Sequence, residues 1–177
     1  MTDKQKLPRI HLYTGSGECK TTNALGLALR AVGHGKKVIV IQFMKGRKDI
    51  GEYKIRKRLY PEYEIHQFGR KEFVNLKNPK KIDYVLAQKG LNFAKKALKK
   101  RPDLLILEEI NLAVAIGLLK LNDVIGFLKS IPKGTVVVLT GRRAHKKLIE
   151  ISDLVTVMQD IKHPFRKGII ARKGIEY

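Results

Sequence analysis

The sequence predicts an α/β protein of three layers, in which a mostly parallel β-sheet is flanked by helices on both faces. Three observations predict this fold class. Short runs rich in β-branched residues alternate along the chain with longer helix-like segments, an order typical of parallel sheets. The run 38–43 (VIVIQF) is apolar almost throughout, as a strand covered on both faces should be. A turn rich in glycine and serine stands between the first run and the first helical segment.

The individual elements follow from local patterns. Strands are expected at 9–13, 38–43, 64–68, 104–107, 135–139 and 154–158. Helices are expected at 20–32, 82–100, 112–130 and 144–151. Gly33 and Gly35 are stop signals for the first helix, because glycine adopts the left-handed conformation that ends helices. Along 82–100 the small and apolar residues lie on one stripe with lysines elsewhere, which indicates a helix with one buried face.

The segment 44–63 is charged and leaves the carboxyl end of an expected strand. It carries ten Lys, Arg, Asp or Glu residues and two glycines, so we expect it to be exposed. Ligands of open α/β sheets bind beyond the carboxyl ends of the strands. The segment therefore either borders a binding site or is a solvated connection, and the pattern favours neither.

Length and composition favour a single phosphate-loop domain that spans 1–177 and is long enough for a substantial core. No apolar run approaches the roughly 20 residues that cross a bilayer, and the first eight residues lack the apolar stretch of a secretory signal. Cys19 is the only cysteine, which excludes a disulfide within the chain and a cysteine-cluster metal site. We therefore expect a cytoplasmic protein.

The charge balance is strongly basic, with 37 Lys and Arg residues against 16 Asp and Glu residues and a net charge of +21. A basic surface attracts polyanions, so nucleic acid is a partner to consider. The basic clusters at 54–58 and 95–101 are not interleaved with the aromatic residues that stack on bases. A solvated basic surface is the favoured interpretation, with a nucleic-acid surface as the alternative.

The stretch 13–22 (YTGSGECKTT) has the context of a phosphate-binding loop, namely a strand, a glycine-rich turn and a helix. Backbone N–H groups and a helix N-terminus then point at an anion. Lys20 supplies a charge for phosphates, and the hydroxyl of Thr21 is a ligand for Mg²⁺. The general pattern places glycine at two positions where this chain has Thr14 and Cys19.

The stretch 103–111 (DLLILEEIN) supplies a second element, because a buried strand ends there in Glu108 and Glu109. In phosphate-loop enzymes an acidic residue at such a strand end holds Mg²⁺ opposite the loop Thr. Either glutamate suits this role. The alternative is that the pair caps the next helix, where its dipole favours negative charge.

Several ordered motifs together resemble the phosphate-loop type of ATP:corrinoid (cob(I)alamin) adenosyltransferase. The loop of that family reads T-G-x-G-x-G-K-T-T, and the matching residues are Thr14, Gly15, Gly17, Lys20, Thr21 and Thr22. The likeness continues through 67–74, 105–119, 137–158 and 162–177. It therefore covers almost the whole chain.

The resemblance implies a phosphate-loop NTPase (RecA-like) architecture and a specific reaction. The family transfers the 5′-deoxyadenosyl group of ATP to Co(I) of a reduced corrinoid such as cobalamin and releases triphosphate. It further implies Mg²⁺ with ATP, a homodimer and a reductase that delivers Co(I); nucleic acid is the less favoured partner.

The resemblance also carries site residues over to this chain. The ATP-binding set is Gly15, Ser16, Gly17, Glu18, Cys19, Lys20, Thr21 and Thr22, of which Lys20 and Thr21 are assigned as catalytic. The metal set is Thr21 with Glu108 or Glu109. The corrinoid set is Phe73 and Arg142.

The chain departs from the family pattern in ways that predict weakened activity. Cys19 replaces a loop glycine, and a left-handed conformation there would cost about 1–2 kcal/mol. Glu18 stands where the family commonly has Lys, so we expect its carboxylate to point into solvent rather than toward triphosphate. The chain has no Trp to pair with Phe73 against the corrin. His163 in KHPF fits a turn before a last strand as well as a catalytic role.

Two alternatives to an active transferase stay open at this point. One is a basic, phosphate-loop ATPase that binds nucleic acid, in which the charge of +21 is the functional feature. The other is a catalytically weakened family member that only binds nucleotide or corrinoid.

Overall fold

The computed structural model describes residues 9–175 and contains one six-stranded sheet in the order β3-β2-β4-β5-β1-β6. The strands are β1 (Ile10–Thr14), β2 (Val38–Phe43), β3 (Tyr63–Phe68), β4 (Leu104–Glu108), β5 (Val136–Thr140) and β6 (Leu154–Val157). Every neighbouring pair is parallel. The expected parallel sheet is confirmed, and all the carboxyl ends of its strands meet at one edge.

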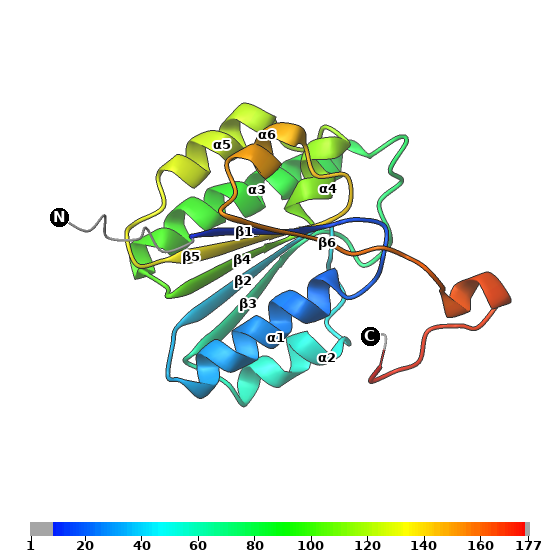
Figure 1. Cartoon of the computed structure of the whole chain (residues 1–177), viewed down its shortest axis with the longest axis horizontal. Coiled ribbons are helices and arrows are strands. Elements are labelled where there is room, and N and C mark those ends of the chain that lie inside the picture. The colour runs from blue at the N-terminus through cyan, green and yellow to red at the C-terminus, as the bar shows by residue number, and fades with distance from the viewer. Residues whose placement is uncertain (1–8, 176–177) are drawn as a thin grey trace.

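Helices cover both faces of the sheet, which gives the expected three layers (Figure 1). On one face lie α1 (Lys20–Gly33) and α2 (Gly51–Lys54). On the other lie α3 (Lys81–Ala97), α4 (Ile110–Ala115), α5 (Leu121–Lys129) and α6 (Lys146–Glu150). Short 3₁₀ turns are η1 (Ile55–Lys57), η2 (Leu98–Lys100) and η3 (Pro164–Lys167). No helix among residues 9–175 is long and apolar enough to cross a membrane.

β2 is buried at all six positions, and its five apolar side chains alternate between two core clusters, whereas the sixth residue, Gln42, is polar. Ile39 and Ile41 pack in the cluster beneath α3, with Leu91 of that helix. Val40 packs in the cluster beneath α1, with Ala28. A strand covered on both faces needs apolar side chains on both, which is why the run lacks a polar alternation.

The expected helix 112–130 is wrong as one element, since α4 and α5 are separate helices. Gly117 follows α4 with φ 78°. The N–H of Leu118 donates to the carbonyl of Ala113 at 2.9 Å and that of Gly117 to Val114 at 3.0 Å. This pair of hydrogen bonds closes a helix C-terminus around a left-handed glycine. The apolar periodicity continues across the break and hides it in the sequence.

The turn expected at His163 is confirmed, but no strand follows it within residues 9–175. Pro164 begins η3 instead, and the imidazole Nδ1 of His163 accepts a hydrogen bond from the N–H of Phe165 at 3.1 Å. Proline lacks the N–H that a strand donates to its neighbour. The segment 159–175, here called the C-terminal arm, leaves β6 and projects from the body of the molecule (Figure 1).

Candidate functional site

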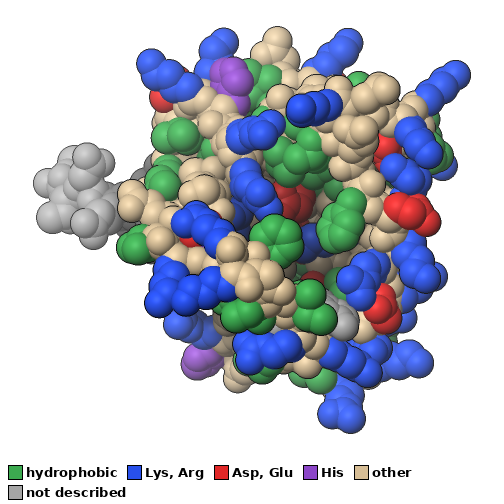
Figure 2. Space-filling model, turned by 90° about the vertical axis from the view of Figure 1, so that its right-hand side faces the viewer, with side chains coloured by type: hydrophobic (Ala, Val, Ile, Leu, Met, Phe, Trp, Pro, Cys, Tyr) green, Lys and Arg blue, Asp and Glu red, His purple; other side chains and the backbone are tan. Residues whose placement is uncertain are grey.

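The parallel sheet brings the sequence-predicted site residues to one edge. The loop begins at Thr14, the last residue of β1; Glu108 ends β4 and Glu109 follows it; Arg142 follows β5. These strands are close neighbours in the sheet order β4-β5-β1. Figure 2 shows this face of the molecule, where Lys and Arg side chains surround a hollow in which acidic side chains are visible.

The loop itself needs glycine at two positions because the chain after β6 packs against it. Gly15 has φ 101°, and a Cβ atom there would collide with the carbonyl of Met158. A Cβ atom at Gly17 would lie 2.7 Å from the carbonyl oxygen of Gln159. The N–H of Gly17 donates to the carbonyl of Met158 at 2.8 Å. Any side chain at either position would push the two segments apart.

Cys19 adopts the left-handed conformation that the loop pattern reserves for glycine. Its φ is 69°, it stands at the N-cap of α1, and it is exposed. For a residue with a Cβ atom this conformation costs about 1–2 kcal/mol. The position therefore carries the strain that the sequence comparison anticipated.

Lys20 is buried and folds back on its own loop, where its ammonium donates to the carbonyl of Gly17. Burial lowers the pKa of Lys20, and the nearby carboxylate of Glu109 opposes that shift. An ammonium held inside the loop is positioned to meet an anion seated on the same loop.

Glu108 is the glutamate that faces the loop threonine. It is 1% exposed, and its Oε1 accepts a hydrogen bond from the hydroxyl of Thr21 at 2.6 Å. Its Oε2 accepts from the side-chain amide of Gln42. Two protein oxygens, a hydroxyl on α1 and a carboxylate on β4, thus stand side by side.

Glu109 makes no hydrogen bond to the loop threonine and does not cap the next helix. It occupies the N-cap position of α4 with φ 63°, but its side chain makes no capping hydrogen bond. Its Oε2 has no hydrogen-bond partner within the described part of the chain. Burial raises the pKa of Glu109, which Lys45 opposes and Glu108 reinforces. The capping interpretation of the pair is therefore wrong for this residue.

Lys45 is a site residue that the sequence reasoning missed. Its ammonium forms an ion pair with Oε1 of Glu108, the oxygen that also accepts from Thr21. Burial lowers the pKa of Lys45, but the Glu108 carboxylate outweighs burial and the net shift is upward. The only available signal was its place two residues after the carboxyl end of β2.

The backbone around Lys45 explains how the segment 44–63 reaches the site. Met44 turns the chain with φ 57°. Gly69 has no room for a side chain against the backbone of Met44, and a Cβ atom at Gly46 would lie 2.5 Å from the Gly69 carbonyl oxygen. This close approach holds the start of the segment against the end of β3. The segment borders the site, as one of the two interpretations expected.

The two residues assigned to corrinoid differ in their position. Arg142 lines a hollow with Thr14, Gly15, Ser16, Arg143, Ala144 and Val157, so it lies beside the phosphate loop. Phe73 is 94% exposed in the connection between β3 and α3, which leaves the same edge of the sheet. The structure thus brings Arg142 to the loop and leaves Phe73 free to meet a molecule from outside.

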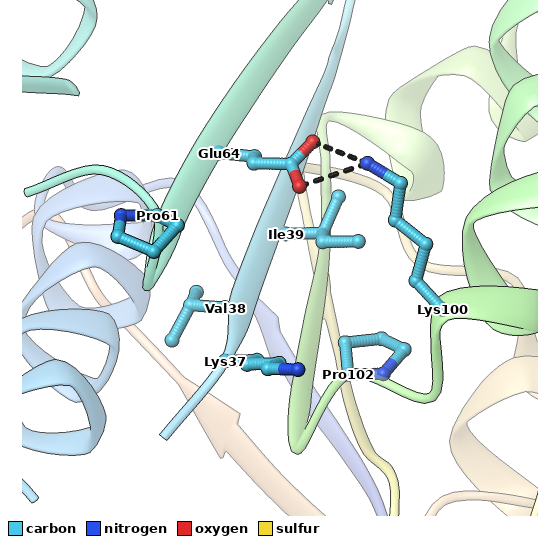
Figure 3. Close-up of a pocket in the computed structure, with 7 residues that line it drawn as sticks. All are labelled: Lys37, Val38, Ile39, Pro61, Glu64, Lys100 and Pro102. Atoms are coloured by element: carbon cyan, nitrogen blue, oxygen red, sulfur yellow. Dashed lines mark hydrogen bonds and ion pairs between the residues drawn. The ribbon is translucent and has the colours of Figure 1, made fainter. Parts of the chain in front are cut away.

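A second hollow lies at the opposite edge of the sheet, where the strands begin (Figure 3). It is lined by Lys37, Val38, Ile39, Pro61, Glu64, Lys100 and Pro102. The ammonium of Lys100 donates to both oxygens of Glu64 at 2.8 and 2.9 Å. Because these charges satisfy each other and the phosphate loop lies at the far ends of the strands, we assign this hollow no part in the chemistry of the loop.

Two solved structures of archaeal proteins have a similar fold. A KaiC-like protein from Pyrococcus horikoshii superposes with a TM-score of 0.58 at 14% identity and covers 88% of this chain and 74% of its own. The flagellar accessory protein FlaH from Methanocaldococcus jannaschii gives 0.52 at 15% identity, with coverages of 87% and 73%. These likenesses support the three-layer α/β fold and carry no further argument.

Sequence relatives are closer. The model of the family described as ATP:corrinoid adenosyltransferase BtuR/CobO/CobP matches residues 6–177. A corrinoid adenosyltransferase from Sinorhizobium is 36% identical and covers 99% of this chain and 82% of its own length. Those from Pseudomonas aeruginosa and Escherichia coli K12 are 36% and 35% identical, over 94% and 95% of this chain and 82% and 85% of their own lengths. This chain therefore belongs to the ATP:corrinoid adenosyltransferase family.

Proposed function

We propose that this protein transfers the 5′-deoxyadenosyl group of ATP to the cobalt of a reduced corrinoid. The single observation that carries the proposal is the pairing of Thr21, directly after the loop lysine, with the buried carboxylate of Glu108. It stands in a chain that belongs to the corrinoid adenosyltransferase family. A loop for triphosphate and a carboxylate for its cation are what a reaction with triphosphate as leaving group requires.

The chemistry needs no protein nucleophile. The electron pair of Co(I) attacks the 5′ carbon of the ribose, a Co–C bond forms, and the C–O bond to triphosphate breaks. The bonding electrons of that C–O bond leave on the triphosphate. The protein contributes position and the stabilisation of negative charge on the departing oxygen.

In this proposal the loop N–H groups, the N-terminus of α1 and Lys20 bind the triphosphate. Lys20 turns from the Gly17 carbonyl to a phosphate oxygen, exchanging one acceptor for a charged one. Gly15 and Gly17 let the backbone approach the anion closely. We also assign Ser16 and Thr22 to the binding of the triphosphate.

The donor set around Glu108 fits Mg²⁺. No group of three or more His, Cys, Asp or Glu residues within 9–175 is arranged to hold a metal. Mg²⁺ usually takes one or two protein oxygens and completes its shell with phosphates and water. Thr21 and Glu108 would hold it, and the bound ion would neutralise charge on the triphosphate. Lys45 adds a cation to the same carboxylate, and Glu109 stays outside this pair.

For the corrinoid we propose Phe73 as an apolar contact and Arg142 as a polar one. An exposed aromatic ring offers a large apolar surface to a flat ligand. The guanidinium of Arg142 suits acidic or amide groups at the corrin edge. We also propose that Cys19 and Glu18 slow the reaction, because one strains the loop and the other adds negative charge to it.

We further propose a homodimer formed through the C-terminal arm. Its exposed apolar side chains are Ile161, Phe165, Ile169, Ile170 and Ile175. They continue from β6, an edge strand that has no sheet neighbour on its outer side among residues 9–175. A second copy would cover them. The proposal treats 1–177 as one domain and includes a cytoplasmic setting, where ATP is available and a reductase delivers Co(I).

An anaerobic assay tests the transfer. ATP, Mg²⁺ and chemically reduced cobalamin are mixed with the protein, and the corrinoid absorption spectrum and triphosphate are followed. We expect adenosylated corrinoid and triphosphate in equal amounts. Bound ATP without product at high protein concentration would leave a family member that only binds. Phosphate release without corrinoid would favour an ATPase.

A further inference from the structure

The residues that lead from β6 into the C-terminal arm run along the phosphate loop. We call residues 158–163 the strap. The N–H of Met158 donates to the carbonyl of Thr14 at 2.8 Å, and the carbonyl of Met158 accepts from Gly17 at 2.8 Å. The N–H of Asp160 donates to the hydroxyl of Ser16 at 3.4 Å. The strap and the loop therefore run side by side, joined by hydrogen bonds at Met158 and Asp160.

The last strap residue, His163, contacts the acidic residue of the loop. Its Nε2 lies 2.6 Å from Oε1 of Glu18. Its Nδ1 accepts a hydrogen bond from the N–H of Phe165 at 3.1 Å. A ring nitrogen that accepts carries no proton, so the proton of the neutral ring is on Nε2 and points at the Glu18 carboxylate. The pairing thus needs no charge on the imidazole.

The strap end is itself held in place. The guanidinium of Arg166 donates to Oδ2 of Asp160 at 2.7 Å, which closes the turn that carries His163. The side chain of His163 is 26% exposed, against 57% for Glu18. The imidazole of His163 is therefore the better anchored partner. Its position sets the direction of the Glu18 carboxylate.

Glu18 matters because of where it stands. It lies between Gly17 and Cys19, inside the loop whose N–H groups bind the triphosphate under the proposed function. A carboxylate turned toward that anion repels it, whereas one turned away is screened by water. Of these two directions, the structure shows the carboxylate directed to the strap.

We propose that His163 is a positioning residue for ATP binding, which holds the Glu18 carboxylate away from the triphosphate. The inference rests on the proposed function only in that the loop binds ATP. It assigns the histidine a role outside the chemistry of transfer. It also gives a structural cause for the expected direction of Glu18 into solvent, since its side chain is 57% exposed and contacts His163.

A double-mutant cycle tests this, with the dissociation constant of ATP measured by calorimetry with Mg²⁺ and without corrinoid. We expect His163→Ala to weaken ATP binding by about threefold to tenfold, the scale of one screened charge contact. His163→Gln keeps an N–H donor and should restore most of the loss. His34→Ala, at the far end of α1, is the matched control and should match the wild type.

The decisive variant combines the two changes. Glu18→Gln removes the repelling charge, so His163→Ala in that background should change the dissociation constant less than about twofold. An equal loss in both backgrounds would show that His163 acts only on the shape of the strap, and the proposal would be wrong. The proposal would also be wrong if His163→Ala bound ATP with the affinity of the wild type. Glu18→Gln alone should also have little effect; a large gain would mean that the carboxylate already faces the triphosphate.

The outcome separates this inference from the proposed function. If the wild type binds ATP and makes no adenosylated corrinoid, the proposed transfer is wrong. The double-mutant cycle still decides the role of His163 in that case. If the wild type binds no ATP, both proposals fall together.

Discussion

The hydroxyl of Thr21 and the carboxylate Oε1 of Glu108 are 2.6 Å apart, joining the first turn of α1 to the end of β4. This bond connects two motifs that are 87 positions apart in the chain. It also distinguishes Glu108 from its neighbour Glu109. Glu109 makes no such contact, and its backbone has a left-handed conformation with φ 63°. The two adjacent carboxylates therefore differ in their contacts, and only Glu108 meets the loop threonine.

Glu108→Gln should lower kcat of adenosyl transfer by about 100-fold, the size of losing one well-placed electrostatic group in an active site. The amide keeps the shape of the side chain but removes the charge that would hold Mg²⁺ with Thr21. Glu109→Gln is the matched control, and its kcat should fall far less. The check is the rate as a function of Mg²⁺ concentration in both variants. A larger loss in Glu109→Gln would reverse the assignment.

Cys19→Gly should relieve the left-handed strain at φ 69°. We expect this variant to be about 1 kcal/mol more stable than Cys19→Ala, because strain of about 1–2 kcal/mol is partly offset by the greater unfolded-state entropy of glycine. Chemical denaturation measures the difference, and the Ala variant isolates the backbone effect from loss of the thiol. The transfer rate should rise in the Gly variant. An unchanged or lower rate would show a loop adapted to cysteine.

Asp83→Asn should destabilise the protein at neutral pH and much less in acid. Asp83 is 3% exposed; its carboxylate accepts from Arg70 at 2.8 Å and from the Lys80 N–H at 2.9 Å. The Arg70 guanidinium lowers the pKa of Asp83, opposed by burial. The stabilisation is therefore fully present above the unfolded value near pH 3.9 and is lost as pH falls through the lower folded value.

The expected cost of Asp83→Asn at pH 7 is about 1–3 kcal/mol, from urea denaturation at a series of pH values. Asp123→Asn is the control, because Asp123 also lies in the first turn of its helix but is exposed, and it should cost less than about 0.5 kcal/mol. A pH-independent cost at Asp83 would contradict the role of its charge. The ion pair of Arg70 with Asp83 matters for function because it ties the segment that carries Phe73 to α3.

Phe73→Ala should raise KM for the corrinoid by about 10-fold and leave the dissociation constant of ATP unchanged. The ring is 94% exposed, and truncating an aromatic contact in an interface costs more than about 1 kcal/mol when that contact is buried by the ligand. Tyr60→Ala is the control, since Tyr60 is also exposed, at 72%, but precedes β3 rather than following it. Equal effects of the two substitutions would remove Phe73 from the corrinoid site.

Much of the fold was predictable because it depends on patterns a few residues long. The run 38–43 predicted β2 with both of its bounds, since complete burial makes five of its six residues apolar and leaves Gln42 as the one polar position. The break between α4 and α5 was missed, because Gly117 interrupts the backbone without interrupting the apolar pattern. The strand expected after His163 was wrong, because a side-chain cap and Pro164 favoured a 3₁₀ turn.

The site was predictable to the level of motifs but not of contacts. The loop 14–22 and the glutamate pair were visible in the sequence, and so was the likeness that identified the family. Three contacts were not visible in the sequence. They are the choice of Glu108 over Glu109 by Thr21, the ion pair of Lys45 with Glu108, and the partner of Glu18. Each depends on the packing of β4 or of the strap, and such packing joins residues far apart in the chain.

The sequence by itself determined the three-layer fold, the position of the phosphate loop and the family, because strand and helix periodicity and loop glycines are local properties. The tertiary structure alone decided which charges meet. It placed Glu108 opposite Thr21, made Cys19 bear a left-handed backbone, and set His163 against Glu18. The reason is physical: a parallel sheet gathers the carboxyl ends of distant strands at one edge, and the direction of each side chain there depends on all its neighbours.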